Sequence, residues 1–337
     1  MSADLLNADW LNTASLHFQS VTFSGLQPGA RLIVLGAVHG NETCGSRAIR
    51  RVIGEIESGA QKLVAGQVCF VPVTNPLAYA HQRRMGDRNL NRNLAPTEAP
   101  VEFEDHIANW LCPLLAQHDV LLDLHSFHTA GQPFVMLGPE DNAGTLEPFA
   151  RAAEETALAL RLGVQRFVDG WLDTYAAGVA RRVAAGVSSA EADARPVDLK
   201  AADARYGVGT TEYMRAHGGI ALTLECGQHD DPAAPDVAWR AIRNTLAHLG
   251  MTAEPAPAPV TQTEALSLYA VIDRIHAGDH FARRWSSFDP VRAGERIGTR
   301  YDGTPVTAEV DGYVVFPNPA AQPGQEWFYL ARRSARL

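Results

Sequence analysis

The chain has 337 residues, which is enough for one large catalytic domain and a smaller second domain. Hydrophobic residues make up 46% and charged residues 20%, which are globular proportions, and no run approaches the roughly 18 unbroken apolar residues of a membrane span. Lys and Arg number 29 against 38 Asp and Glu, so the net charge of −9 disfavours nucleic acid and anionic membranes as partners.

The first twenty residues contain no Lys or Arg and lack the basic start and apolar centre of a secretory signal. The four cysteines are far apart and form no CxxC pair, which favours reduced thiols over a disulfide framework. We therefore expect a cytoplasmic protein.

The first half of the chain alternates strand and helix patterns. An apolar run at 31–38 predicts a buried strand that ends at His39, and the helical spacing at 44–57 predicts the helix that follows. Similar patterns predict strands at 67–73 and 120–124, with helices at 101–117 and 144–162. The Ala-rich stretch 176–204 is also predicted to be helical.

A further strand is predicted at 219–225 and a helix at 237–249. Such alternation predicts an α/β fold with a mostly parallel or mixed sheet flanked by helices, over a catalytic domain at 1–250. In such sheets the active residues gather at the carboxyl ends of the strands.

Pro and Ala alternate after residue 251, a composition typical of an extended linker, which we place at 251–264. Short strand-like runs then follow, separated by Gly, Asp and Pro turns, at 266–272, 295–300, 307–310 and 312–316. The sequence thus predicts a small β-rich C-terminal domain at 265–337.

Two polar motifs follow predicted strands. His39 and Glu42 lie three residues apart where the first strand ends, and His125 ends the strand at 120–124. Two imidazoles and one carboxylate leave a fourth tetrahedral position open, as in catalytic zinc sites. The alternative is that Glu42 favours the helix dipole and His125 is a hydrogen-bonded core histidine; His128 is a rival third ligand.

The segment 83–92 places four arginines within ten residues and has no clear periodicity. On its own it indicates a solvated basic loop. Together with HGNE at 39–42, NLNR at 89–92, DLH at 123–125 and LEC at 224–226, it resembles the aspartoacylase and succinylglutamate desuccinylase family of zinc carboxypeptidase-like hydrolases. The motifs follow the family's order and span about residues 32–228.

The resemblance implies a role for each matching residue. His39, Glu42 and His125 would hold one zinc ion per chain, and Glu225 would be the carboxylate that activates water. Arg84 would polarise the scissile carbonyl. Asn91 and Arg92 would grip a substrate carboxylate, a task suited to the planar guanidinium fork.

Some positions depart from the family's pattern. Arg215 matches a second carboxylate-binding arginine of the aspartoacylase branch, but the tyrosine expected four residues before it is Thr211, with Tyr213 nearby. The acidic residue familiar before Leu90 is Asn89. These differences bear on the substrate more than on the reaction.

Without the resemblance, Glu225 would be an acidic residue that ends an apolar strand, and the alternative role is a buried ion pair. We favour general-base catalysis, because a carboxylate at the sheet edge beside a metal is well sited for it.

Residues 287–316 resemble the barrel-sandwich modules of lipoyl and biotinyl carriers, but the last hairpin carries no lysine, so no attached cofactor is expected. Related deacylases use a β-domain to narrow the mouth of the active site, which the resemblance suggests here. Whether Tyr213, Tyr301 or Tyr313 reaches the substrate is left open.

The sequence therefore favours a zinc-dependent amidohydrolase that deacylates a small N-acylated amino acid. The alternatives are a metallocarboxypeptidase that cuts peptides and a non-catalytic metal-binding scaffold. Neither the acyl group nor the amino acid is specified, and the oligomeric state is open, with a homo-oligomer among the choices.

Overall fold

The computed structural model describes residues 16–184 and 203–337. Its centre is an eleven-stranded sheet in the order β1-β3-β2-β4-β7-β5-β6-β8-β14-β13-β10. Neighbouring strands from β3 through β2 and β4 to β7 are parallel. These four strands are β2 (Gln27–Gly36), β3 (Ala65–Val71), β4 (Val120–Phe127) and β7 (Ile220–Gln228).

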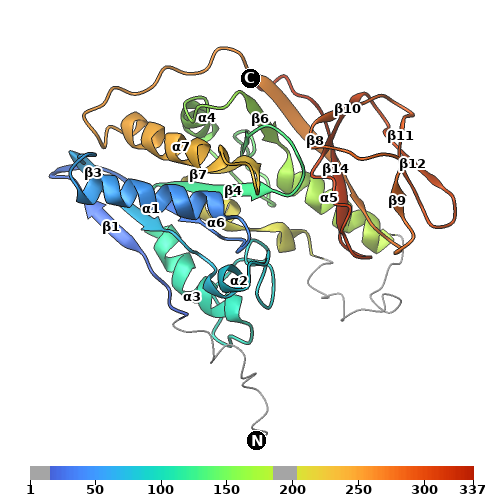
Figure 1. Ribbon diagram of the computed structural model, residues 1–337, viewed down its shortest axis with the longest axis horizontal. Coiled ribbons are helices and arrows are strands. Elements are labelled where there is room, and N and C mark those ends of the chain that lie inside the picture. The colour runs from blue at the N-terminus through green and yellow to red at the C-terminus, as the bar shows by residue number, and fades with distance from the viewer. Residues whose placement is uncertain (1–15, 185–202) are drawn as a thin grey trace, which may run out of the picture.

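Helices cover both faces of this parallel core (Figure 1). In β2, Leu32 and Val34 pack on one face and Ile33 and Leu35 on the other, as the two-residue period of a strand requires. The first face is covered by α1 (Thr43–Glu57), α4 (Ala152–Ala159) and α7 (Ala234–His248), and the second by α3 (Phe103–Ala116) and α6 (Thr210–Ala216). Strands buried on both faces explain the nearly continuous apolar runs in the sequence.

Short segments complete this part of the molecule. β1 (Val21–Ser24) pairs with β3 in antiparallel fashion, and α2 (Pro76–Ala80) follows β3. β5 (Phe134–Met136) is antiparallel to β7, and β6 (Arg166–Asp169) lies parallel to β5 and leads into α5 (Trp171–Ala184). A 3₁₀ turn, η2 (Ala204–Gly207), precedes α6.

The C-terminal strands extend the same sheet and add a second one, on the right in Figure 1. β8 (Glu264–Asp273) pairs in parallel with β6, and β14 (Glu326–Arg333), β13 (Gly312–Val315) and β10 (Asp289–Val291) continue antiparallel. A small antiparallel sheet contains β9 (His280–Phe281), β11 (Arg296–Thr299) and β12 (Pro305–Thr307). The division into domains at 1–250 and 265–337, with a linker at 251–264, stays a prediction.

The predicted fold class is confirmed: a mixed sheet flanked by helices, with a small antiparallel sheet at the C-terminal end. The predicted helix at 144–162 is shorter, because Pro148 disfavours helical geometry before it and α4 begins only at Ala152. The strand predicted at 307–310 lies earlier, as β12 at Pro305–Thr307. Of the predicted helix at 176–204, α5 covers the part up to Ala184, and 185–202 lie outside the described residues.

All four cysteines are buried and free. Among the described residues, no helix is long and apolar enough to cross a bilayer.

Candidate functional site

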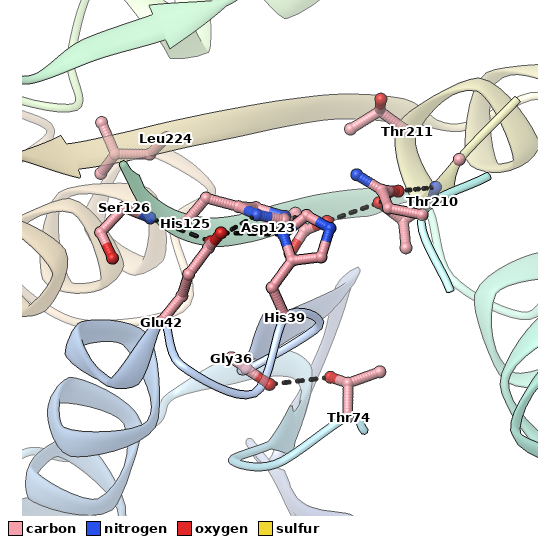
Figure 2. Close-up of polar contacts among 12 residues, drawn as sticks. Gly36, His39, Glu42, Thr74, Asp123, His125, Ser126, Thr210, Thr211 and Leu224 are labelled. Carbon is pink, nitrogen blue, oxygen red and sulfur yellow. Dashed lines mark hydrogen bonds and ion pairs between the residues drawn. The ribbon is translucent and has the colours of Figure 1, made fainter. Parts of the chain in front are cut away.

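The loop between β2 and α1 is held in an unusual conformation. Ala37, fully buried, has a φ of 50°, in the left-handed region that an alanine rarely adopts. The Thr74 hydroxyl donates to the Gly36 carbonyl at 2.9 Å and fixes the end of β2 (Figure 2). At Gly40 a Cβ atom would lie 2.0 Å from the Ala78 carbonyl carbon, so only glycine fits. The loop thereby places His39 and Glu42 on either side of a glycine that cannot be replaced.

Three side chains converge at the carboxyl ends of β2 and β4. His39 Nδ1 lies 2.9 Å from Glu42 Oε1, and His125 Nδ1 lies 2.9 Å from Glu42 Oε2. One potential ligand atom from each residue lies within 4.8 Å of the others, and all three side chains are buried (Figure 2). Glu42 occupies the N-cap position of α1 but makes no side-chain capping bond. Its carboxylate instead contacts His39 and His125.

The opposite edges of both imidazoles also have polar partners. His39 Nε2 bonds to Asn89 Oδ1 at 3.1 Å, and His125 Nε2 lies 3.0 Å from Asp123 Oδ2. The Thr210 hydroxyl in turn donates to Asp123 (Figure 2). Partners of this kind fix the ring orientation and leave the other ring nitrogen as the donor atom toward a metal.

Electrostatics at this cluster suit a cation. Burial, assisted by the Arg84 charge, lowers the pKa of His39 to about 4 and keeps its imidazole neutral. Burial opposes ionisation of Glu42, but the two histidines outweigh it and lower its pKa well below the usual value. Burial alone would lower the pKa of His125, but the charges of Asp123 and Glu42 raise it. The carboxylates around His125 therefore stabilise positive charge.

The donor set fits a zinc ion. Glu42 Oε1 lies 2.9 Å from His39 Nδ1, yet this nitrogen has no hydrogen-bond partner among the described residues. The lone pairs of the two atoms therefore face a common point. Two imidazole nitrogens and one carboxylate are typical of zinc, whereas magnesium prefers oxygen ligands.

Glu225 lies beside this cluster, because β4 and β7 pair in parallel with His125 opposite Glu225. Its Oε2 atom is buried and has no hydrogen-bond partner in the described part of the chain. Burial, and secondly the Glu42 charge, raise its pKa to about 8, against the opposing effect of His125 and Arg84. A buried ion pair, the alternative role, has no counterpart among the salt bridges of the described residues.

A pocket opens from this cluster. Arg84 is half-exposed, and its Nη1 donates to Glu42 Oε1 at 3.0 Å. Asn91 and Arg92 line the same pocket, together with Thr211 and Glu225. A larger cavity of about 760 Å³ lies alongside and shares only His128 with it. The smaller pocket is the candidate site, because His39, His125 and Glu225 line it and do not line the larger cavity.

Asn91 and Arg92 are held differently. Asn91 Oδ1 accepts from the Thr210 N–H at 2.9 Å, so its NH₂ group is the part available to a ligand. Arg92 is 8% exposed, and its guanidinium lies 4.8 Å from the Trp171 ring centre. Its Nη2 lies 3.6 Å from Glu326 Oε1, on β14.

Arg215 belongs to a buried ion-pair network. Its Nε donates to Glu155 at 2.8 Å, its Nη1 to Glu147 at 2.8 Å and its Nη2 to the Ala221 carbonyl at 2.6 Å. Glu155 also accepts from the backbone N–H groups of Gly138 and Ala221. All three guanidinium nitrogens are therefore in use, although part of the side chain borders the pocket.

The remaining candidates lie at the margins. His128 Nε2 donates to the Pro317 carbonyl at 2.9 Å, and His128 is outside the ligand cluster. Tyr301 is 71% exposed, and neither Tyr301, Tyr313 nor Tyr213 lines the pocket. Tyr329 does so instead.

Sequence reasoning missed several contributors. Asp123 could have been found, since the two-residue strand period places it on the same face as His125. Glu326 and Tyr329 carried no such signal, because they lie on β14 about a hundred residues after Glu225.

Residues 28–135 match the model of the succinylglutamate desuccinylase/aspartoacylase catalytic domain family. This match confirms the resemblance that the motifs carry over the segment containing His39, Glu42, Arg84, Arg92 and His125. No curated protein matches the sequence.

Solved structures share the fold. A succinylglutamate desuccinylase/aspartoacylase from Rhodobacter sphaeroides is 18% identical, with a TM-score of 0.69 over 94% of this chain and 89% of that one. The succinylglutamate desuccinylase from Vibrio cholerae is 19% identical, with a TM-score of 0.65 over 90% and 82%. The ectoine utilization protein EutE (DoeB) from Ruegeria pomeroyi is 19% identical, with a TM-score of 0.62 over 93% and 88%.

Proposed function

We propose that this protein is a zinc-dependent amidohydrolase that removes the acyl group from a small N-acylated amino acid. The observation that carries the proposal is the convergence of potential ligand atoms of His39, Glu42 and His125 within 4.8 Å. Directly beside them lies Glu225, whose buried Oε2 atom has no hydrogen-bond partner among the described residues. The match of residues 28–135 to a hydrolase catalytic domain supports the same reaction class.

His39, Glu42 and His125 would hold the metal. When bound, zinc would supply Lewis-acid activation of water and of the amide carbonyl. Glu225 would accept a proton from the attacking water and pass it to the leaving amine. Without metal the pKa of Glu225 is about 8, and a cation bound beside it would lower this pKa toward neutrality, where a carboxylate can both accept and release a proton.

Three further side chains would orient the substrate. Arg84, half-exposed and next to Glu42, would donate to the scissile carbonyl oxygen. The Asn91 NH₂ group and Arg92 would hold the carboxylate of the amino acid. Arg215 was assigned to the same task from the sequence, and that role is the weakest of the set because its donors are already occupied.

The pocket walls favour a small substrate over a peptide. Glu326 and Tyr329 of β14 and Phe316 after β13 line the side of the pocket away from the parallel strands. A carboxypeptidase needs an open cleft for the rest of its peptide, whereas these side chains narrow the space around Arg92.

The proposal is tested by incubating the zinc-loaded protein with N-succinyl, N-acetyl and N-formyl amino acids and measuring the amine released. We expect turnover of at least one class, and turnover lower by roughly 10² to 10⁴ in the Glu225→Gln variant prepared in the same way. Release of C-terminal residues from peptides, without release of amine from the acyl amino acids, would contradict the proposal and favour the peptidase.

A further inference from the structure

The larger cavity, of about 760 Å³, lies beside the catalytic pocket and takes no part in the proposed reaction. One side of it is built from the catalytic core, where Thr129 follows β4 and Gln228 ends β7. The other side is built from the C-terminal strands and includes Phe281 of β9 and Trp327 of β14. Small-molecule sites typically measure about 300–1,000 Å³, so the cavity is large enough for a ligand of its own.

Three arginines line this cavity, and two of them have no carboxylate partner among the described residues. Arg274 donates to the Ala321 carbonyl at 2.8 Å and to the Ala277 carbonyl at 2.7 Å, which fixes its guanidinium without neutralising its charge. Arg284 is exposed and forms no ion pair in the described part of the chain. Both positive charges therefore remain available to a ligand.

The nearby carboxylates, in contrast, are paired with other arginines. Asp279 lines the cavity but is 1% exposed, and it accepts from Arg300 at 2.8 Å. Asp289 lies outside the lining and accepts from Arg283, the third arginine of the cavity, at 3.0 Å. The cavity is thus a region of positive potential in a chain whose net charge is −9.

Hydrogen-bond donors are held in place at the wall before β10. The Arg283 guanidinium lies 3.5 Å from the Trp285 ring centre, and only its Nη1 is used by partners among the described residues. Arg284 is its neighbour in the sequence, and Ser286 adds a hydroxyl to the same lining. Two guanidinium groups beside a hydroxyl form a donor set that suits the oxygen atoms of carboxylates and phosphates.

One short segment separates the cavity from the catalytic pocket. Phe316 and Asn318 line the catalytic pocket, whereas Pro317 and Pro319 line the cavity. The proline rings restrict the backbone of this segment. His128, which lines both spaces, donates to the Pro317 carbonyl at 2.9 Å. A ligand in the cavity would therefore contact the same segment that forms one wall of the catalytic pocket.

We propose that this cavity is an accessory site for a small multivalent oxyanion, a phosphate or a polycarboxylate, and that its occupancy alters substrate binding through residues 316–319. Arg283 and Arg284 bind the anion. A multivalent anion is favoured over a monovalent one because it can contact both guanidinium groups at once. Binding is independent of the proposed deacylase function, whereas the effect on substrate binding rests on it.

The first test measures binding by calorimetry on the metal-loaded protein, with inorganic phosphate and with tricarballylate, a tricarboxylate. We expect saturable binding of at least one, and the tighter of the two identifies the natural ligand as a phosphate or a polycarboxylate. Arg284→Gln should weaken this binding by about tenfold or more. Arg333→Gln is the matched control, because Arg333 is exposed on the same C-terminal sheet and lies outside both cavities, so its affinity should match the wild type.

Three results would overturn the site. They are the absence of binding of either anion at millimolar concentration, an unchanged affinity in Arg284→Gln, and binding that survives in Arg284→Gln but is lost in Arg84→Gln, which would place the anion in the catalytic pocket. If Arg284→Gln does not fold, Arg283→Gln takes its place and should show the same loss; unchanged affinity there would have the same meaning.

The second test measures the effect on catalysis. The KM of an acyl amino acid is determined at increasing concentrations of the anion that binds. We expect KM to change by about fivefold or more and then to level off, in the wild type and in Arg333→Gln but not in Arg284→Gln. A KM that rises without limit, or does not change, would overturn the coupling between the two cavities. If no acyl amino acid is hydrolysed, the deacylase function fails, and calorimetry alone decides whether the anion site exists.

Discussion

Among the described residues, the buried charged side chains around Arg215 and those around Glu42 differ in how completely their polar atoms are paired. In the Arg215 network, the guanidinium contacts Glu155, Glu147 and a backbone carbonyl, and Glu155 receives two further backbone N–H groups. In the cluster around Glu42, His39 Nδ1 and Glu225 Oε2 have no hydrogen-bond partner in the described part of the chain.

The difference separates structural from functional use of charge. Burying a polar atom without a partner costs free energy, so a fold that tolerates several at one point is arranged for something else to bind there. A closed network needs no ligand and instead holds α6 against β7. We therefore expect substitutions in the Glu42 cluster to change catalysis, and those in the Arg215 network to change folding.

The largest effect is expected for Glu225→Gln, which keeps the shape of the side chain and removes the base. Turnover should fall by roughly 10² to 10⁴, while bound metal and the melting temperature change little. Steady-state kinetics, metal content and thermal melting on one preparation test this. A variant with a lower melting temperature but near-normal turnover per folded molecule would show that Glu225 has a structural role and not a catalytic one.

Arg215→Ala tests the other side of the comparison. Removing the guanidinium leaves the buried Glu155 carboxylate without a countercharge, so the free energy of unfolding should fall by about 3–5 kcal/mol in denaturant titrations. Arg31→Ala is the control, because it removes an arginine from an exposed pair with Asp119 and should unfold close to the wild type. Normal stability with a raised KM would instead assign Arg215 to the substrate, as the sequence suggested.

A smaller effect is expected for Arg92→Lys, which keeps the charge but loses the planar fork and its contact with Trp171. Substrate binding should weaken by about 2 kcal/mol, read as an increase in KM. Arg83→Lys is a control in the same loop, because Arg83 is exposed and lies outside the pocket. An unchanged KM in Arg92→Lys would exclude Arg92 from substrate binding.

The smallest effect concerns the pH dependence of the metal-free protein. The pKa of Glu225 is about 8 when folded, above the ordinary 4.5, so the folded state binds the extra proton between these values. The free energy of unfolding should therefore decrease as pH rises from about 4.5 to about 8, and Glu225→Gln should remove part of this slope. A variant with the same slope as the wild type, in chelator-treated protein, would show that Glu225 ionises normally.

The sequence predicted the parallel core and the convergence of His39, Glu42 and His125 better than it predicted the rest of the pocket lining. Long apolar runs such as 31–38 and 219–225 identify strands buried on both faces, and His39, Glu42 and His125 follow such runs directly. In contrast, β5 and β6 have three and four residues, too few for a period to show, although they connect the core to β8.

The residues that line the pocket lie far apart in the sequence. Glu326 reaches the pocket because β14 pairs with β8 and β8 pairs with β6. These pairings join strands that are distant in the sequence, so the local residue pattern does not predict them. Likewise, the position of Arg215 in the sequence suggested a substrate-binding role. Its ion pair with the buried Glu155 depends on tertiary packing, which the sequence pattern does not show.

The most direct test of the central claim is elemental analysis of protein purified without added metal. We expect about one zinc ion per chain, lost in His39→Ala but retained in His128→Ala, because His128 bonds to Pro317 outside the cluster. The absence of any transition metal from the wild type, together with hydrolytic activity that survives strong chelators, would contradict a metal site at His39, Glu42 and His125.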